Sequence, residues 1–392
     1  MEHFASYTQF ILTQPLIHTK LMRTSSGLMI KPARILSALT LGLAIAACSS
    51  DNPAAPTPAP GFLGGIEGNR EIGLVVNSGS KSLTMFQLGS PSTTKQVALG
   101  SSSTITLTGY SIRNRKAAVP LGNAASVAIV DLENGGVTRF FTFPDGNTTG
   151  SAWVNDSTVF AANTNTNKVG RFTLGQSATE ITATVNVAPA PTSISFAAGK
   201  VLVLSGNLEN YQPIGNGIVT AIDPATLGIL GTVETGGTNP NEAAVGPDGL
   251  LYVVNTGDYV NPGSLAIIDP VSLTRVALIQ NISVGPGSIS IHENGLAFIS
   301  SFSDATVVFN TRTRSMVRGT DNPVCARVQS TGACRGASSA ALGNDGKLYQ
   351  TFFGSTSSGL APYVFVFDAS TYALKDSIAV GSGPMSLSIR SY

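Results

Sequence analysis

A strand pattern with a period of 46 residues is the strongest constraint on how this chain folds. The clearest unit runs from Pro240 to Pro286 and contains four short apolar stretches separated by turns rich in Gly, Asn and Pro. One stretch ends in Asn255 and the next ends in Asp269. Asp223 precedes Asp269 by 46 positions, and the pattern extends in both directions. The spacing varies, with 41 residues from Asp269 to Asn310 and 58 from Asn310 to Asp368, but a period in this range predicts one repeat array instead of several independent domains.

Two kinds of strand can be counted along the whole chain. The first kind recurs seven times, at 74–77, 117–120, 159–163, 201–205, 252–255, 297–301 and 349–353. The second kind also recurs seven times, at 83–88, 127–131, 169–174, 219–223, 265–269, 306–310 and 364–368. Units of four short strands at this spacing are typical of β-propellers. We therefore predict an all-β fold, a single seven-bladed β-propeller of four-stranded antiparallel blades, over residues 70–392.

The two ends of the repeat array are out of phase with each other. The first unit begins directly at its second strand, near Glu71, without an inner strand before it. The last unit is followed by one extra strand, 384–390. If this strand completes the first blade, both counts agree and the ring has no open sheet edge. We expect the C-terminal strand to close the propeller.

The sharpest part of the array, 217–300, resembles the YVTN-type β-propeller repeat. The resemblance depends on Leu-Tyr-Val-Val-Asn at 251–255, Ser-Leu-Ala-Ile-Ile-Asp-Pro at 264–270 and Val-Gly-Pro at 284–286. It extends over about residues 70–392 and implies an exported, surface-layer-like bacterial protein. The first three units and the sixth depart from the pattern, with Ala-Val-Pro at 118–120 and with Asn310 in place of the Asp.

The N-terminal region carries the features of an export signal. Residues 35–47 form an apolar run that follows Lys31 and Arg34, with the length of a signal-peptide core and too short to span a bilayer. The segment Ile-Ala-Ala-Cys at 45–48 resembles the bacterial lipobox, in which the cysteine is acylated and becomes the mature N-terminus. The alternative is an ordinary secretory signal that happens to contain a cysteine.

These features divide the chain into three parts. Residues 1–47 form the signal region, with Met29 or Met22 as a more ordinary start than Met1. Residues 48–69 contain the lipidated Cys48 and a Pro-rich tether, and 70–392 form the propeller. We expect a lipid-anchored protein of the bacterial cell envelope. Export also favours a disulfide between Cys325 and Cys334, which bracket a polar loop.

The charge pattern limits the class of partner. The net charge is +1, and no basic stripe is present, so we expect no nucleic-acid partner. We expect a monomer that binds a protein, peptide or glycan through long loops, which rigid blades hold in place. The candidate ligand-binding residues are Glu209, Tyr211, Asn241, Glu242, Asp258, Tyr259 and Arg335. Ordinary solvated loops are the competing interpretation.

Catalysis has weaker support in the sequence. His292 is the one histidine after the signal region, and its place in a turn suggests a role on the face opposite the long loops. We expect neither a metal nor a cofactor. The favoured function is a non-catalytic binding or scaffold propeller. The alternative is a lactonase-like hydrolase of the envelope that uses Glu242, Asp258 and Arg335.

Overall fold

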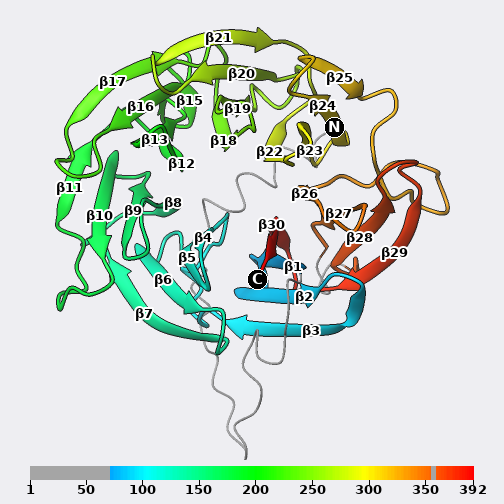
Figure 1. The fold of residues 1–392 in the computed structure, drawn as a ribbon, viewed down its shortest axis with the longest axis horizontal. Coiled ribbons are helices and arrows are strands. Elements are labelled where there is room, and N and C mark those ends of the chain that lie inside the picture. The colour runs from blue at the N-terminus through cyan, green and yellow to red at the C-terminus, as the bar shows by residue number, and fades with distance from the viewer. Residues whose placement is uncertain (1–70, 355–358) are drawn as a thin grey trace, which may run out of the picture. The chain divides into compact units, whose positions relative to one another are not determined.

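The computed structural model describes residues 71–354 and 359–392, in which all regular structure is β-strand. Seven four-stranded antiparallel sheets surround a central opening (Figure 1). The predicted fold class and blade number are therefore confirmed. The signal region, Cys48 and the tether lie outside the described residues. Within the described part, the structure contains no helix with the length and apolar character needed to cross a membrane.

Each blade runs from an innermost strand to an outermost strand. Blade 1 contains, in that order, β30 (Pro384–Ser391), β1 (Glu71–Asn77), β2 (Ser82–Gln87) and β3 (Ser90–Ala98). Blade 2 contains β4 (Ser111–Arg113), β5 (Lys116–Pro120), β6 (Ser126–Asp131) and β7 (Gly136–Thr142). Blade 3 contains β8 (Thr148–Trp153), β9 (Thr158–Asn163), β10 (Lys168–Thr173) and β11 (Ala183–Asn186).

The remaining blades follow the same order. Blade 4 contains β12 (Pro191–Ala197), β13 (Lys200–Ser205), β16 (Ile218–Ile222) and β17 (Ile229–Glu234). Blade 5 contains β18 (Pro240–Val245), β19 (Leu251–Asn255), β20 (Ser264–Asp269) and β21 (Thr274–Ile279). Blade 6 contains β22 (Pro286–Ile291), β23 (Leu296–Ser301), β24 (Ala305–Asn310) and β25 (Ser315–Arg318). Blade 7 contains β26 (Ser339–Leu342), β27 (Lys347–Phe352), β28 (Tyr363–Asp368) and β29 (Leu374–Ala379).

The apolar core lies between the blades. Each of the seven junctions in the described ring is filled by its own cluster of buried apolar side chains. Successive residues of a strand point to opposite faces of its sheet. In β13, Val201 and Val203 therefore pack against blade 3, whereas Leu202 and Leu204 pack against blade 5. Both faces of a blade are covered, which explains the nearly continuous apolar strands in the sequence.

The C-terminal strand closes the ring as expected. β30 pairs with β1 in antiparallel register, from Glu71 opposite Ser391 to Val76 opposite Ser386. A tyrosine from the connection to blade 2 reinforces this pair. The Tyr110 hydroxyl lies 2.5 Å from the Leu74 carbonyl oxygen, to which it donates, and 2.8 Å from the Ser388 hydroxyl.

Hydroxyl groups join neighbouring blades at the positions where the repeat has proline. At four junctions a Ser or Thr hydroxyl donates to the carbonyl oxygen of the proline that begins the next inner strand. The pairs are Thr164 with Pro191 (2.6 Å), Thr192 with Pro240 (3.3 Å), Thr256 with Pro286 (2.8 Å) and Ser338 with Pro384 (2.6 Å). The proline that begins these inner strands, as in Val-Gly-Pro at 284–286, therefore marks a hydrogen bond between blades.

The aspartate of the repeat caps the turn between the third and fourth strands. Asp223 Oδ1 accepts the backbone N–H groups of residues 225 and 226 at 2.8 and 2.9 Å. Asp131, Asp269 and Asp368 accept the equivalent pairs. Asn310 makes the same two bonds at 2.9 and 3.1 Å, so the departure of blade 6 from the repeat preserves the turn.

The predicted disulfide between Cys325 and Cys334 is present. It closes a hairpin in the connection between blades 6 and 7, where Arg327 pairs with Cys334. The same connection contributes the buried Val324, which bridges to Thr306 of β24. The disulfide therefore fixes a segment that is partly core and partly exposed loop.

Deleting residues 384–392 should strongly destabilise the protein. The deletion leaves β1 as an open edge and exposes apolar side chains in the junction with blade 7, at a cost of at least about 3 kcal/mol. Chemical denaturation of the full-length and truncated proteins measures the change. The variant Leu374→Ala is the control, because it removes an exposed apolar side chain from an outermost strand without opening a sheet edge. A truncated protein as stable as the full chain would contradict closure by β30.

Candidate functional site

The chain connections lie on two faces of the ring. The connections between blades and the loops between second and third strands lie on one face, which we call the loop face. The turns between first and second strands and between third and fourth strands lie on the opposite face, the turn face. Glu71, the first residue of β1, lies on the turn face because second strands run from the turn face to the loop face.

Exposed apolar side chains gather on the loop face of three successive blades. They are Tyr211 (66% exposed) and Ile214 (57%) on blade 4, Tyr259 (51%) and Val260 (78%) on blade 5, and Phe302 (47%) on blade 6. We call these five residues the loop-face arc. Many other exposed apolar side chains are scattered on the outermost strands, where single residues need no special explanation. The arc differs because all of its members lie on equivalent loops.

Both tyrosines of the arc have a backbone conformation that favours glycine. Asn210 and Tyr211 have φ values of 48° and 63°, and they connect the short strands β14 (Leu208–Glu209) and β15 (Gln212–Pro213). Tyr259 has a φ of 62°. A left-handed residue with a large side chain costs about 1–2 kcal/mol relative to the right-handed region. The loops therefore present the two rings at a cost in stability, which is typical of functional positions.

Asp258 stabilises the loop that carries Tyr259. Its carboxylate accepts the backbone N–H groups of Val260 (2.9 Å) and Asn261 (2.7 Å) and the Asn261 side-chain amide (2.7 Å). These bonds hold the pKa of Asp258 down to about 2, so it stays ionised. Glu209 lies exposed in the blade 4 hairpin.

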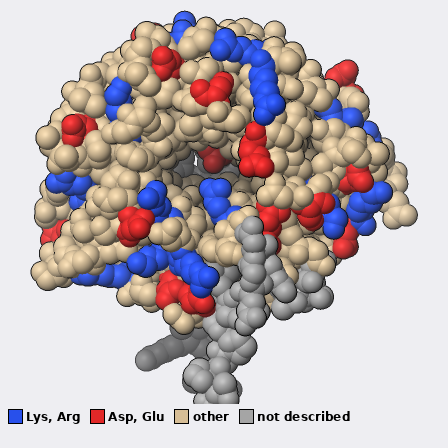
Figure 2. Space-filling view, in the orientation of Figure 1, with Lys and Arg blue, Asp and Glu red and all other residues tan. Residues whose placement is uncertain are grey.

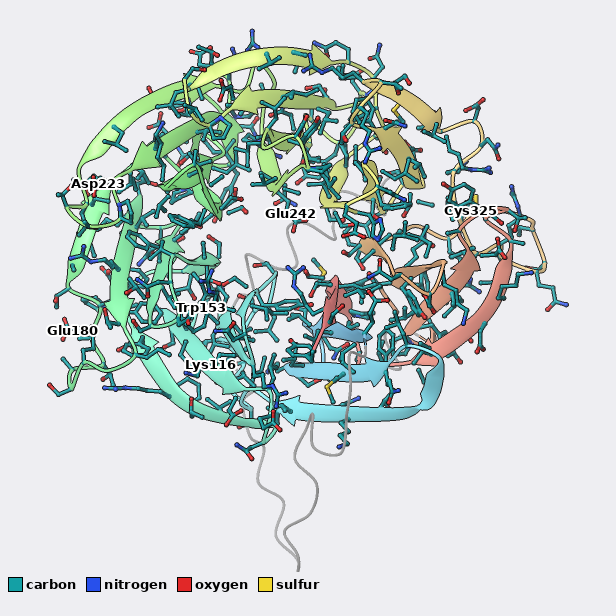
Figure 3. The ribbon with its side chains drawn as sticks, viewed as in Figure 1. Lys116, Trp153, Glu180, Asp223, Glu242 and Cys325 are labelled. Carbon is teal, nitrogen blue, oxygen red and sulfur yellow. A yellow bond between two sulfur atoms is a disulfide. The ribbon has the colours of Figure 1, made fainter. Side chains whose placement is uncertain are left out.

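Asn241 and Glu242 lie on the inner strand of blade 5 and contact the inner strand of blade 6. The Asn241 amide donates to the Gly287 carbonyl oxygen at 2.6 Å, and the Ile289 N–H donates to Glu242 Oε2 at 3.2 Å. Figure 3 labels Glu242 at the edge of the central opening, and an acidic group is visible inside that opening in Figure 2. Burial raises the pKa of Glu242 to about 7, and the Ile289 amide only partly offsets this.

Arg335 lies farther from the inner strand than the sequence suggested. The strand β26 begins at Ser339, and the Arg335 N–H donates to the Ala326 carbonyl oxygen within the disulfide-closed connection. The guanidinium carbon stands 5.0 Å from the centre of the Phe352 ring. The predicted residues therefore fall into three groups. One lies on the loops of blades 4 and 5, one lies at the central opening, and Arg335 lies on the connection between blades 6 and 7, elsewhere on the loop face.

His292 lies on the turn face, as the sequence indicated. Its Nδ1 accepts the Asn294 N–H at 3.3 Å, which leaves the proton on Nε2 to be donated to Asn344 Oδ1 at 3.2 Å. Asn344 in turn donates to both carboxylate oxygens of Glu71, at 2.7 and 2.9 Å. The histidine therefore belongs to a hydrogen-bonded chain that links blades 6, 7 and 1.

Sequence reasoning missed the apolar members of the arc, Ile214, Val260 and Phe302. The signal that could have found them is a large apolar residue inside a loop segment flanked by Asn, Gly and Pro. In the described residues, no group of three or more His, Cys, Asp or Glu side chains is placed to hold a metal ion. The candidate site is therefore the apolar loop-face arc, with Glu242 as a separate ionisable group in the opening.

The variant Glu242→Gln should stabilise the protein at high pH. Below about pH 4.5 the Glu242 carboxyl is largely neutral in both the folded and the unfolded protein. Between pH 4.5 and 7 it is ionised in the unfolded protein but still largely neutral in the folded protein. Stability of the wild-type protein thus falls as pH rises, by on the order of 1–3 kcal/mol above pH 7. Urea denaturation of both proteins at pH 4.5 and 8 measures this, with Glu209→Gln as the exposed control. A difference between variant and wild type that does not change with pH would contradict the burial of Glu242.

Comparison with known proteins shows the fold and nothing finer. No protein-family model matches the chain, and no curated protein sequence matches it. A functionally unknown protein from Desulfotomaculum acetoxidans DSM 771 aligns with a TM-score of 0.60 and 16% identity, over 82% of this chain and 99% of that one. Hydrazine synthase from Kuenenia stuttgartiensis aligns with a TM-score of 0.57 and 13% identity, over 74% of this chain and 91% of that one. At these identities the likeness establishes the propeller fold alone.

Proposed function

We propose that this protein is a non-catalytic binding or scaffold propeller of the bacterial cell envelope, anchored by a lipid on Cys48. The loop-face arc carries the proposal, because large exposed apolar side chains that recur on one face among polar loops are typical of interaction surfaces. Its two tyrosines combine a large apolar ring with a hydroxyl that forms a hydrogen bond, a combination enriched at binding sites.

The composition of the arc favours a protein or peptide segment as the partner. Ile214 and Val260 are aliphatic and are 57% and 78% exposed. Sugar hydroxyls buried against such side chains would lose hydrogen bonds to water without replacement, which is costly. Apolar side chains of a peptide would instead gain from the same contact.

The point where the Cys48 segment joins the propeller leaves the loop face available for a partner. The segment that carries Cys48 joins the propeller at Glu71, on the turn face. A lipid on Cys48 would therefore connect to the turn face and leave the arc without a covalent attachment.

A lactonase-like hydrolase is the second candidate, and one observation favours it. The pKa of Glu242 is raised to about 7, the range that suits a general acid or base at neutral pH. Within the described residues, its carboxylate accepts a single hydrogen bond, from Ile289 N–H. Hydrolysis of a lactone that is lost in Glu242→Gln, while the variant stays folded, would favour this candidate over the first.

Replacing Cys48 by Ala should abolish lipidation and membrane association. A bacterial host expressing each protein is labelled with a radioactive fatty acid, and the label is followed after separation of membranes from soluble extract. We expect labelled wild-type protein in the membrane fraction and unlabelled variant outside it. Equal labelling of both proteins would contradict the lipid anchor, and an unlabelled wild type would favour the ordinary secretory signal.

The variants Tyr211→Gly and Tyr259→Gly should weaken partner binding without loss of stability. Glycine relieves the left-handed strain but removes the ring, so we expect an unchanged or higher melting temperature. A random-peptide library panned against the full-length protein provides the ligand, with a glycan array in parallel. We expect each variant to bind the selected peptide at least about tenfold more weakly, as for an interface anchor residue. The matched control is Phe140→Ala, an exposed aromatic residue on the outer strand of blade 2.

Two results would contradict the role of the arc. One is a selected peptide that binds both tyrosine variants as tightly as it binds the wild-type protein. The other is equal weakening by the Phe140→Ala control, which would point to nonspecific adhesion to exposed rings. Binding confined to the glycan array would replace the peptide with a sugar as the partner.

A further inference from the structure

A cavity on the turn face has a chemistry different from that of the loop-face arc. It has a volume of about 360 Å³ and lies where blades 1 and 2 meet. It is lined by Ile112, Asn114, Arg115, Arg390, Ser391 and Tyr392. Two guanidinium groups, one amide and two hydroxyls therefore surround the space, and no lining side chain is a carboxylate.

The two arginines differ in how they are neutralised. Arg115 forms an ion pair with Glu133, a residue outside the cavity lining. Arg390 forms no ion pair and no side-chain hydrogen bond with any described residue. Arg390 is thus a cation of the cavity lining that no described carboxylate pairs directly.

Tyr392 has a hydroxyl whose hydrogen-bonding capacity the described residues leave unused. Its hydroxyl oxygen is buried and has no hydrogen-bond partner. Burial raises the pKa of this tyrosine to about 12, so the hydroxyl keeps its proton at neutral pH. A buried donor without an acceptor is costly, and an anion oxygen that reached this hydroxyl from the cavity would remove that cost.

A second cavity, of about 460 Å³, shares Asn114 and Arg115 with the first. It adds Arg113 and Lys116, together with Asp131 and Asp156. Arg113 is paired with Asp156 at 2.9 Å, whereas Lys116 makes no ion pair with a described residue. Basic side chains gather over blade 2 in Figure 2, and Figure 3 labels Lys116 there. The cations of the second cavity are thus largely balanced by carboxylates, unlike Arg390 in the first.

We propose that the cavity between Arg115, Arg390 and Tyr392 binds a phosphoryl anion. Guanidinium groups present planar pairs of N–H donors that match phosphate oxygens, and the tetrahedral anion can also accept from the Tyr392 and Ser391 hydroxyls. Ser391 pairs with Glu71, so the cavity adjoins the point where the segment carrying Cys48 joins the propeller. The phosphate can therefore belong to a membrane-lipid headgroup or to a soluble phosphate ester.

Titration of the full-length protein with inorganic phosphate at constant ionic strength tests the site itself. Calorimetry should give saturable binding at one site in the wild-type protein. Arg390→Gln and Arg115→Gln should each weaken binding at least about tenfold, since each removes charged hydrogen bonds. Tyr392→Phe should weaken it several-fold and leave the fold intact, because it removes only the unpaired hydroxyl.

The matched control is Arg314→Gln, which removes one positive charge from a blade 6 turn on the same face. It should leave phosphate binding unchanged. Equal weakening by Arg314→Gln and Arg390→Gln would show a diffuse charge effect and overturn the proposal. Absence of phosphate binding would also overturn it. Should Arg390→Gln fail to fold, Arg390→Lys and Tyr392→Phe supply the same comparison.

Vesicles distinguish the two sources of phosphate. The full-length chain with Cys48→Ser is mixed with vesicles of phosphatidylglycerol or of phosphatidylcholine, so that a lipid anchor cannot contribute. Sedimentation with phosphatidylglycerol vesicles that is lost in Arg390→Gln and competed by inorganic phosphate assigns the site to a lipid headgroup. Phosphate binding without vesicle binding assigns it to a soluble phosphate ester. Vesicle binding that Arg390→Gln and Tyr392→Phe both leave unchanged would contradict the site.

Discussion

The pairing of β30 with β1 is the interaction on which the rest of the structure depends. Each blade of the described ring buries both of its faces against its neighbours, so no blade has a complete core of its own. Without β30, the sheet of blade 1 lacks its inner strand and Val75 loses its neighbour Leu387. The other junctions are then held by a ring that is open at one position. The stability of all seven junctions therefore depends on this one strand pair.

The repeat could be read from the sequence because its markers act locally. Asp269 caps its own turn two and three residues downstream, and Asn310 does the same with an amide oxygen. Tyr252 donates to Asp248 four residues away at 2.8 Å, and this pair recurs as Tyr349 with Asp345. Such short-range hydrogen bonds need the same residue types at the same spacing in each blade. The strand count and the closing strand followed from that regularity.

The properties of the candidate sites come from contacts between blades and could not be read in this way. Glu242 is partly buried and accepts the N–H of a residue 47 positions later in the chain. Arg335 lies in the connection between blades 6 and 7, which does not follow the repeat. Its position relative to β26 therefore could not be predicted from the other units. The left-handed φ of Tyr211 and Tyr259 likewise has no sequence signal, since glycine or asparagine is the usual residue there. The cavity at Arg390 requires the closing strand to be placed beside blade 2.

The polar composition also follows from the ring. Only 11% of the residues are charged, and Ser and Thr hydroxyls donate across the junctions where longer ionic side chains would have to be desolvated. Charge therefore lies mostly on the exposed surface, and on the turn face many carboxylates are fixed in turn caps. The pKa values of Asp223 and Asp269 are lowered by the hydrogen bonds that they accept, so these caps remain anionic at neutral pH. At the blade 2 turn the basic side chains are largely balanced, because Arg113 and Arg115 are paired with Asp156 and Glu133, whereas Arg390 has no ion-pair partner among the described residues. Recognition of an anion in the cavity would therefore depend on the hydrogen bonds that Arg390 and its neighbours donate, and not on a net positive field over the turn face.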